Sequence, residues 1–435
     1  MALEKTRGRC IQSGELVVVI GAGRSGQAAA KLLSQEGAKV RLLDNNPNSL
    51  NKRQYNSLIK MGIEVILGDH NVKHFENASY VIPSPGIPAS SLSKYFDIDS
   101  SGSPEIMAEM ELAWRYLDNE PVLAVTGTSG KTTTASLAAA MLQSQGYSVF
   151  LGGNIGTPLS EYVLAKRKAD ALVLEISSFQ LQTCTTFCPR VGILLNISPN
   201  HLDYHKDMKE YIEAKFRLFR CQDEGDLAIL GSGLKKLAKL FNIKSRSLWI
   251  DDTERFTKYK LLGKHNLFNI EAAWQACRFF GVSEKNAAKA VAKFKPLPHR
   301  LEKVREYNDV LYVNDSKCTT VAALKVALEA FDSPIRLLCG GKFKGGDLSS
   351  LSNLIREKVR EIALFGASRS EFENAWQDIL PMYWYPKLDK AVKALAKSAR
   401  AGDVVLLAPA TSSFDLYENY MARGDDFKKI VGELG

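Results

Sequence analysis

No stretch of the sequence has the length and apolar character of a membrane-spanning helix, which takes about 18 or more consecutive apolar residues. Residues 1–13 carry the charged side chains Glu4, Lys5, Arg7 and Arg9 and contain no apolar segment of the kind that a secretory signal needs. These two absences predict a protein without membrane insertion that works in the cytoplasm.

Disulfide and metal patterns are missing as well. The chain has seven cysteines, an odd number, and no two of them form a CxxC pair. Scattered cysteines in a chain of 435 residues predict reduced thiols rather than a disulfide framework. Cys184 and Cys188 could be metal ligands, but no second pair lies nearby, so we favour ordinary thiols of the core or surface.

Basic residues outnumber acidic ones without gathering in one segment. The net charge is +9, from 57 Lys and Arg against 48 Asp and Glu, and these residues are spread along the chain. No module typical of nucleic-acid binding occurs, so nucleic acid is not the expected partner. A polyanionic small substrate and a simply solvated surface both agree with this charge.

Apolar, β-branched runs alternate with helical patterns and short glycine-rich turns, without internal repeats. This alternation predicts an α/β fold with parallel sheets and crossover helices. Helices are expected over 27–35 and 131–144. The expected strands cover 16–20, 40–43, 122–125, 171–176, 191–195, 227–230, 310–313, 336–339, 362–365 and 404–407. Boundaries near 103 and 298 would give three domains, 1–103, 104–298 and 299–435.

A phosphate-binding turn is the sharpest motif. The segment from Thr126 to Thr133 reads TGTSGKTT, follows an expected strand and opens an expected helix. Glycines let the backbone N–H groups point at phosphate oxygens, and the helix N-terminus adds partial positive charge. Lys131 can reach the β- and γ-phosphates, and the Thr132 hydroxyl can ligate Mg²⁺. The full P-loop pattern has a glycine where this chain has Val125, so the motif is a variant.

A second glycine turn, GAGRSG from Gly21 to Gly26, also lies between an expected strand and helix. With Asp44 at the end of the next strand, it matches the dinucleotide fingerprint and suggests a nicotinamide-dependent oxidoreductase. The same turn can hold any diphosphate, including that of a UDP-sugar. Two phosphate turns in one chain are better explained by ATP plus a second diphosphate ligand. Ser84 and Gly86 follow another apolar strand and could add N–H groups to that ligand.

Acidic and basic side chains of the middle third suggest a metal near the phosphate turn. Glu175 ends an expected strand, where α/β sheets place ligands, and its carboxylate suits Mg²⁺. His201 follows the next strand, and from position alone a metal ligand and a surface histidine are equally good interpretations. Lys215 lies on an amphipathic helical pattern, which by itself predicts a solvated lysine.

Together the motifs resemble the Mur ligase family. They are, in order, GTSGKTT, GGNIGTP, LEISSFQL, NISPNHLDYH, YIEAKFRLF, LLGKHNLFN, LPHRLE, NDSKCTT and LLAPATSSFD, and they span essentially the whole chain. Within the family, the GAGRSG start, SPGIP and LPHRLE are most similar to the members that add D-glutamate. The resemblance implies a Rossmann-like UDP-binding domain, a central P-loop-type ATPase domain and a Rossmann-like C-terminal domain. It also implies an ATP-dependent ligase of peptidoglycan-precursor synthesis, which joins D-glutamate to UDP-N-acetylmuramoyl-L-alanine through an acyl phosphate.

The resemblance further implies residue roles. ATP would be bound by Gly127, Thr128, Ser129, Gly130, Lys131, Thr132, Thr133, Asn266, Asn269, Arg300 (with its neighbour His299) and Asp315. The UDP-sugar would be bound by Ser25, Asp44, Ser84, Gly86 and Asn154. D-glutamate would be bound by Thr319, Lys344, Ser413, Phe414 and Tyr420. Two Mg²⁺ ions would be held by Thr132, Glu175, His201 and a carbamylated Lys215. The catalytic groups would be Lys131, His201, Lys215 and Lys317.

Four positions depart from the family pattern. Asn45 and Asn46 stand where relatives often have a basic residue, Thr320 replaces the final Asn of NDSKATN, and Phe414 replaces an aliphatic residue. A sister ligase for another amino acid, an oxidoreductase and a non-catalytic nucleotide-binding protein remain alternatives. We expect a monomer whose partners are its small-molecule substrates.

Overall fold

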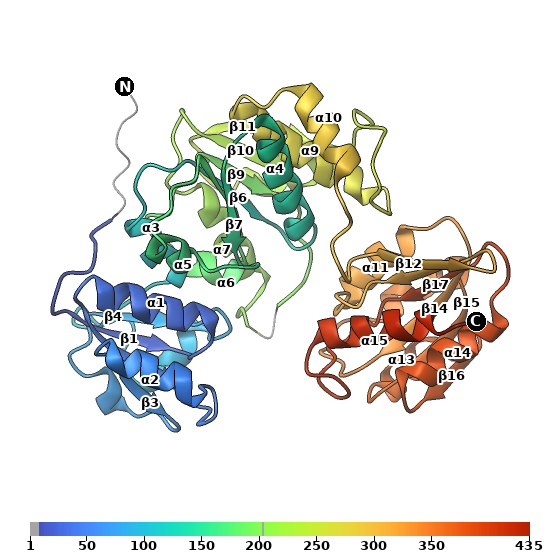
Figure 1. The fold of residues 1–435 in the computed structure, drawn as a ribbon, viewed down its shortest axis with the longest axis horizontal. Helices are drawn as coiled ribbons and strands as arrows, with labels where there is room; N and C mark the ends of the chain where they lie inside the picture. Colours follow the sequence, from blue (N-terminus) through green and yellow to red (C-terminus); the bar gives the residue numbers. More distant parts are fainter. Residues whose placement is uncertain (1–7, 202–203) are drawn as a thin grey trace. The chain divides into compact units, whose positions relative to one another are not determined.

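The computed structural model describes residues 8–201 and 204–435, and these residues build three separate β-sheets (Figure 1). The chain divides into two compact units. One unit takes the chain up to Thr253 together with Asn269–Val291, and the other takes Glu254–Phe268 and Ala292–Gly435. The N-terminal and central sheets therefore belong to the first unit and the C-terminal sheet to the second.

The N-terminal sheet has five parallel strands in the order β3-β2-β1-β4-β5. Its strands are β1 (Leu16–Ile20), β2 (Lys39–Asp44), β3 (Glu64–Leu67), β4 (Tyr80–Pro83) and β5 (Glu105–Ile106). Its helices are α1 (Arg24–Gln35) and α2 (Lys52–Lys60), and α3 (Glu109–Arg115) follows the last strand. The helix expected from residue 27 starts at Arg24, because Gly23 is extended and the next three residues already form the first turn.

The central sheet has six parallel strands in the order β11-β10-β9-β6-β8-β7. Its strands are β6 (Val122–Thr126), β7 (Val149–Gly153), β8 (Ala171–Glu175), β9 (Val191–Leu194), β10 (Leu227–Gly231) and β11 (Arg246–Ile250). The helices of this region are α4 (Lys131–Gln145), α5 (Leu159–Leu164), α6 (Ser178–Gln182), α7 (Met208–Phe216), α8 (Lys235–Ala238), α9 (His265–Phe279) and α10 (Glu284–Lys293).

The C-terminal sheet has six strands in the order β12-β13-β17-β14-β15-β16. They are β12 (Glu302–Tyr307), β13 (Val310–Asn314), β14 (Ile335–Gly340), β15 (Val359–Phe365), β16 (Met382–Tyr385) and β17 (Val404–Leu407). The helices are α11 (Val321–Glu329), α12 (Ser352–Lys358), α13 (Arg369–Trp376), α14 (Leu388–Ser398) and α15 (Tyr420–Gly432). All pairs are parallel except β12 with β13, and this antiparallel edge was not expected.

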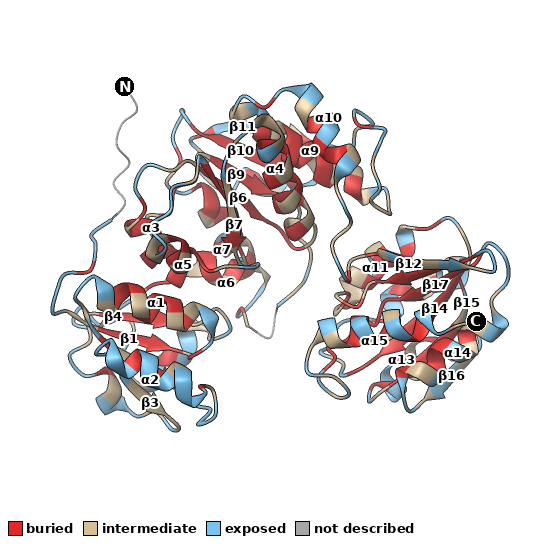
Figure 2. Cartoon of the chain, viewed as in Figure 1, coloured by how far each residue is buried: buried red, intermediate tan, exposed pale blue. Residues whose placement is uncertain are grey.

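The inner strands of the sheets, such as β1, β6, β8, β9, β14 and β17, are buried because helices cover the sheets, which is why they read as unbroken apolar runs. Figure 2 shows red in the inner strands, and blue mainly in the loops and in outer helices such as α2 and α10. Val17, Val19 and Leu42 in the first core and Leu172 and Leu174 in the central core have no exposed surface. Each such side chain contributes about 1.5–3 kcal/mol on burial. The expected α/β fold with three sheet-bearing domains is confirmed.

None of the helices within residues 8–201 and 204–435 combines the length and apolar character that crossing a bilayer requires.

Candidate active site

The carboxyl ends of four neighbouring central strands bring the expected middle-domain residues together. Strands β9, β6, β8 and β7 are adjacent and parallel, so their ends lie along one edge of the sheet. Strand β6 runs into the 127–130 turn, and Glu175 ends β8. Asn196 follows β9 and Asn154 follows β7. This edge is where open α/β sheets place ligands.

Backbone contacts hold the phosphate turn to the strand beside it. The Thr128 N–H donates to Asn196 O at 2.9 Å, and the Ser129 N–H donates to Asn196 Oδ1 at 2.9 Å. Gly130 has φ +83°, in the left-handed region, and a Cβ there would collide with Asn269 Oδ1. Only glycine therefore fits at this position. Asn196 is a site residue that sequence reasoning missed.

Lys131 begins α4, and its ammonium lies over the turn. Its Nζ donates to Gly127 O and Thr128 O, both at 2.9 Å. Thr132, the next residue, is buried at the same helix N-terminus. The positive end of the helix and the lysine charge together favour an anion here.

Glu175 offers an unused carboxylate oxygen beside this turn. Its residue is 2% exposed, and Oε1 accepts a hydrogen bond from Asn154 Nδ2 at 2.7 Å. Oε2 is buried and has no hydrogen-bond partner among the residues that the structure describes. A buried carboxylate oxygen without a donor is costly in a folded protein, and a cation would satisfy it.

Lys215 is buried, so the expectation of a solvated lysine from the helical pattern was wrong. The residue is 1% exposed, and its Nζ donates to Gly127 O at 2.9 Å. Nζ also lies 4.7 Å from the centre of the Tyr211 ring. Burial, helped by the charge of Lys131, lowers the pKa of Lys215 well below its ordinary value, and Glu175 partly opposes this. Lys215 is therefore an amine that readily becomes neutral.

Tyr211 is a further residue that sequence reasoning missed. It lies one turn before Lys215 on α7 and is also buried. Its hydroxyl is 2.9 Å from Thr128 Oγ1, so α7 is joined to the phosphate turn by both residues. The spacing of four residues places both side chains on one helix face and could have indicated the pair.

His201 lies near this group but on the surface. The residue is exposed with φ +57°, and its ring centre is 4.8 Å from that of Phe179. His205 is buried instead, with Nε2 2.9 Å from Ser178 Oγ. Leu202 and Asp203, which belong to the NISPNHLDYH motif, lie outside the described residues.

The side chains that the structure describes do not by themselves complete a metal site. In residues 8–201 and 204–435, no three His, Cys, Asp or Glu side chains are grouped so that they could hold a metal ion. Glu175 with its unused oxygen and the nearby Thr132 would need further oxygen donors, which phosphates or a modified lysine could supply.

Hydrogen bonds from the end of β2 and from the segment after β4 hold the N-terminal glycine turn in place. The Gly21 N–H donates to Leu43 O at 2.6 Å, and the Ala22 N–H donates to Asp44 Oδ2 at 2.6 Å. The Ser84 N–H donates to Ile20 O at 2.7 Å, which places the segment after β4 against the turn. Asp44 Oδ1 also accepts from the Asn46 N–H at 2.9 Å. Asp44 thus supports the turn itself, while Ser25 lies in the first turn of α1.

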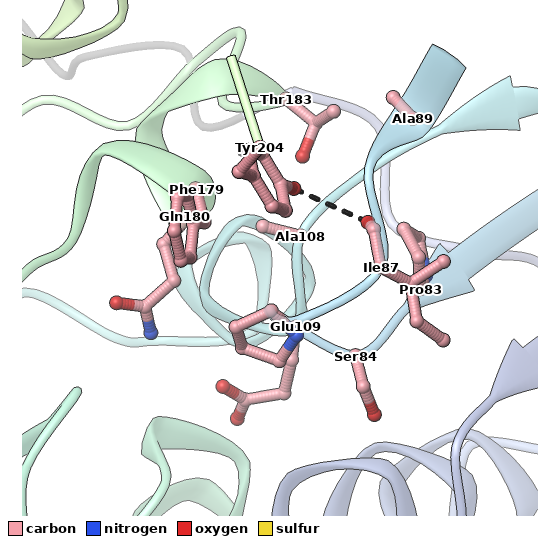
Figure 3. Close-up of a pocket in the computed structure, with 11 residues that line it drawn as sticks. Pro83, Ser84, Ile87, Ala89, Ala108, Glu109, Phe179, Gln180, Thr183 and Tyr204 are labelled. Carbon is pink, nitrogen blue, oxygen red and sulfur yellow. Dashed lines mark hydrogen bonds between the residues drawn. The ribbon is translucent and has the colours of Figure 1, made fainter. Parts of the chain in front are cut away.

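A small cavity lies between the segment after β4 and the start of α6. Its volume is about 10 Å³, close to the lower limit for one water molecule. Figure 3 shows Pro83, Ser84 and Ile87 on one side and the Phe179 and Tyr204 rings on the other. The Tyr204 hydroxyl donates to Ile87 O at 3.2 Å, and its ring stacks on Phe179 with centres 3.7 Å apart. This cavity is too small for a sugar.

In the second unit, the expected residues again follow parallel strands. Asp315 comes after β13 and accepts a hydrogen bond from the Leu301 N–H at 3.2 Å. Burial raises the pKa of Asp315 to about 6, against the opposing effects of the Leu301 N–H and the Arg300 charge. His299 and Leu301, on either side of Arg300, have φ +62° and +41°. Arg300 is therefore carried on a strained turn that contacts Asp315.

Two ammonium groups of this unit lie near aromatic rings. Lys317 Nζ is 5.1 Å from the centre of the Tyr420 ring, and Lys344 Nζ is 5.6 Å from that of Phe414. Phe414 is 65% exposed, whereas its neighbour Ser413 is buried. These distances fall within the range of cation–π contacts. The departure at Phe414 thus gives Lys344 an aromatic neighbour.

Other residues of the second unit have supporting positions. Thr320 caps α11 by accepting from the Ala323 N–H at 3.2 Å, so the departure from Asn keeps a capping side chain. Asn266 on α9 is buried and donates to Leu262 O at 2.7 Å. Arg423, which sequence reasoning missed, is fully buried and donates to Ser316 O and Thr411 O at 2.8 and 3.0 Å.

Comparisons with known proteins agree with this arrangement. Residues 15–94 match the N-terminal domain of MurD-like Mur ligases, 125–247 the Mur ligase middle domain, and 299–411 the Mur ligase glutamate ligase domain. The chain is 67% identical, over all of both chains, to a UDP-N-acetylmuramoylalanine–D-glutamate ligase of Desulfovibrio desulfuricans. It is 54% identical to the protein of the same name from Lawsonia intracellularis, over 96% of this chain and 94% of that one.

Solved structures share the fold at low identity. The MurF ligase of Thermotoga maritima, in complex with ADP, superimposes with a TM-score of 0.59 at 20% identity, over 91% of this chain and 95% of that one. The folylpolyglutamate synthase of Mycobacterium tuberculosis gives 0.58 at 14% identity, over 73% and 93%. The chain belongs to the Mur ligase family.

Proposed function

We propose that this protein is the ATP-dependent ligase that joins D-glutamate to UDP-N-acetylmuramoyl-L-alanine in peptidoglycan-precursor synthesis, and that the 127–132 turn binds the triphosphate. The observation that carries this proposal is the group at the central sheet edge. Lys131 lies over a helix N-terminus, and the buried Lys215 and the unused oxygen of Glu175 lie close by. The relatives named above supply the amino acid and the sugar-linked substrate.

The chemistry explains why a phosphate turn is needed. A carboxylate resists attack by an amine because its leaving group is poor, and transfer of the γ-phosphoryl group of ATP gives an acyl phosphate that the amine of D-glutamate can attack. The chain's part is to position the groups and to stabilise the charge of the transferred phosphoryl group. Lys131 would supply that stabilisation, and Gly127, Thr128, Ser129, Gly130 and Thr133 would surround the phosphates.

We assign the Mg²⁺ positions to Thr132, Glu175, His201 and Lys215. Mg²⁺ would neutralise phosphate charge. Carbamylation would add CO₂ to the Lys215 amine with release of one proton and so give a carboxylate-like oxygen donor; it requires the neutral amine that burial favours. The unpartnered Glu175 oxygen supports a cation in this place.

The remaining assignments are made for each unit separately. In the first unit, Asn269 would contact the nucleotide, and the UDP-sugar would lie on Ser25, Asp44, Ser84, Gly86 and Asn154. In the second unit, Asn266, Arg300 and Asp315 would contact nucleotide and Lys317 the reacting groups, while D-glutamate would lie on Thr319, Lys344, Ser413, Phe414 and Tyr420. We further propose domains at 1–103, 104–298 and 299–435, a monomeric state and a cytoplasmic location.

A substrate-omission assay with a matched pair of variants tests the proposal. ADP release should require UDP-N-acetylmuramoyl-L-alanine, and the amide product should require D-glutamate rather than other amino acids. Lys131→Ala should lower turnover by at least about a hundredfold, because it removes the ammonium group that would stabilise the negative charge of the transferred phosphoryl group. Lys209→Ala is the control, since Lys209 on α7 is 83% exposed and should leave turnover unchanged. Full activity of Lys131→Ala, or product with a different amino acid only, would refute the assignment.

A further inference from the structure

Arg24 joins the glycine turn of the N-terminal sheet to a turn of the central sheet. Its Nε and Nη2 donate to Glu161 Oε1 and Oε2, each at 2.8 Å, so the guanidinium and carboxylate form a paired, two-bond contact. Its Nη1 donates to Gly156 O at 2.8 Å, and Nη2 also reaches Thr157 Oγ1 at 3.3 Å. One side chain therefore contacts three residues that lie more than 130 positions away in the sequence.

Both joined segments carry proposed ligands of the UDP-sugar. Arg24 directly precedes Ser25 in the first turn of α1. Gly156 and Thr157 close the turn that starts after β7, and that turn presents Asn154, whose amide donates to Glu175. The helices behind the two turns, α1 and α5, lie side by side (Figure 1). A shift between the two turns would move Ser25 away from Asn154.

We propose that Arg24 is a positioning residue that fixes the N-terminal glycine turn to the 153–157 turn, so that the two halves of the UDP-sugar site keep one spacing. This inference rests on the UDP-sugar site proposed above. Arg24 is not assigned to the ligand itself, because Nε, Nη1 and Nη2 all donate to the central domain.

The geometry of the Arg24 contacts, rather than their burial, makes the interaction with Glu161 strong. The Arg24 and Glu161 side chains are 58% and 33% exposed, and exposed ion pairs are individually weak. A bidentate guanidinium–carboxylate pair is stronger and directional. Glu161 also lies in the first turn of α5, where the helix N-terminus favours a negative charge. The guanidinium adds hydrogen bonds to a backbone carbonyl and a hydroxyl, so its orientation is over-determined.

Three variants separate positioning from general stability. Arg24→Met keeps most of the apolar length and removes every hydrogen bond, whereas Glu161→Gln removes only the charge of the partner. Arg369→Met is the control. Arg369 forms a 2.8 Å ion pair with Glu373 on α13 and is 57% exposed, but it touches no proposed ligand.

The measurements are the KM of each substrate, kcat, and calorimetric binding of UDP-N-acetylmuramoyl-L-alanine to the full chain without ATP. Both Arg24→Met and Glu161→Gln should weaken that binding and raise that KM by about three- to tenfold, with the KM of ATP and kcat changed by less than about twofold. The double variant should be no worse than Arg24→Met, because the two changes remove the same contact. Arg369→Met should match the wild type.

Two results would overturn the inference. Weaker UDP-sugar binding in Arg24→Met with unchanged binding in Glu161→Gln would make Arg24 a direct ligand. If Arg24→Met and Glu161→Gln instead raised the KM of every substrate equally and lowered the Tm, the contact would be purely structural. Because binding is measured without turnover, a wild-type protein that binds the UDP-sugar but forms no amide would refute the proposed reaction and leave this inference testable.

Discussion

Replacing Asp315 by Asn should stabilise the protein at neutral pH while impairing its proposed function. Asp315 accepts from the Leu301 N–H through Oδ1, and burial raises its pKa to about 6 from an ordinary 3.8. An ionised carboxylate in this place is therefore a cost to folding, and the backbone donor and the Arg300 charge offset it only in part. Asn keeps the acceptor oxygen and removes the charge.

The sign and size follow from proton linkage. Between pH 3.8 and about 6 the folded protein binds more protons at Asp315 than the unfolded chain, so this group makes the free energy of unfolding fall as pH rises through that window. The difference between the folded and the unfolded pKa of Asp315 lowers the free energy of unfolding by about 3 kcal/mol above pH 7, and by roughly half of that at pH 5. Asp315 keeps partial contact with solvent. Because solvent screens this charge, we expect about half of that free energy, about 1.5 kcal/mol at pH 8.

Scanning calorimetry of the full chain at pH 5 and pH 8 measures the effect. Asp315→Asn should raise the Tm of the transition that contains the C-terminal domain by about 3–6 °C at pH 8, and by about half as much at pH 5. Glu329→Gln is the control, because Glu329 is 51% exposed and should not change the Tm at either pH. A variant that melts at or below the wild-type temperature at pH 8 would refute the reasoning, as would a gain that does not depend on pH.

Two further predictions concern buried charges of the first unit. Glu111→Ala should lower the free energy of unfolding by about 3–5 kcal/mol in urea denaturation, because Glu111 is fully buried and accepts from Arg115 Nε and from the backbone of 185–187. Glu64→Ala should cost less than about 1 kcal/mol, since Glu64 is 54% exposed, and equal losses in the two variants would contradict this. Native mass spectrometry should find one added carboxyl group on Lys215, lost on acidification, and a fully active enzyme with an unmodified Lys215 would exclude carbamylation.

The elements that the sequence predicted well are those governed by local chemistry. Buried parallel strands need unbroken apolar runs, so β6 and β8 were found to within one residue, and Glu175 was placed at the end of β8. The turn before Lys131 was recognised because glycine, a cation and a helix start occur within a few residues. Parallel strands end on one side of a sheet, which is why separate motifs could be expected to converge.

The residues that escaped prediction depend on contacts far along the chain. Lys215 donates to the carbonyl of Gly127, 88 residues before it, and Arg24 pairs with Glu161, 137 residues after it. No local pattern encodes either contact. The helical period of α7 could show that Lys215 shares a face with Tyr211, but not that this face packs on the phosphate turn. The resemblance to a family supplied the importance of Lys215, whereas nothing in it indicated Arg24.

The charges around Gly127 give the strongest physical reason for a modified Lys215. Lys131 and Lys215 both donate to the carbonyl oxygen of Gly127, each at 2.9 Å, so two ammonium groups converge on one acceptor. Burial is the largest cause of the lowered pKa of Lys215, and the like charge of Lys131 lowers it further. Conversion of the Lys215 amine into an anion would replace that repulsion by attraction to Lys131 and would place a second oxygen donor near Glu175. The same step would bring a second anionic group near Glu175, and a cation between the two would stabilise both. Modification of Lys215 and binding of Mg²⁺ should therefore depend on one another.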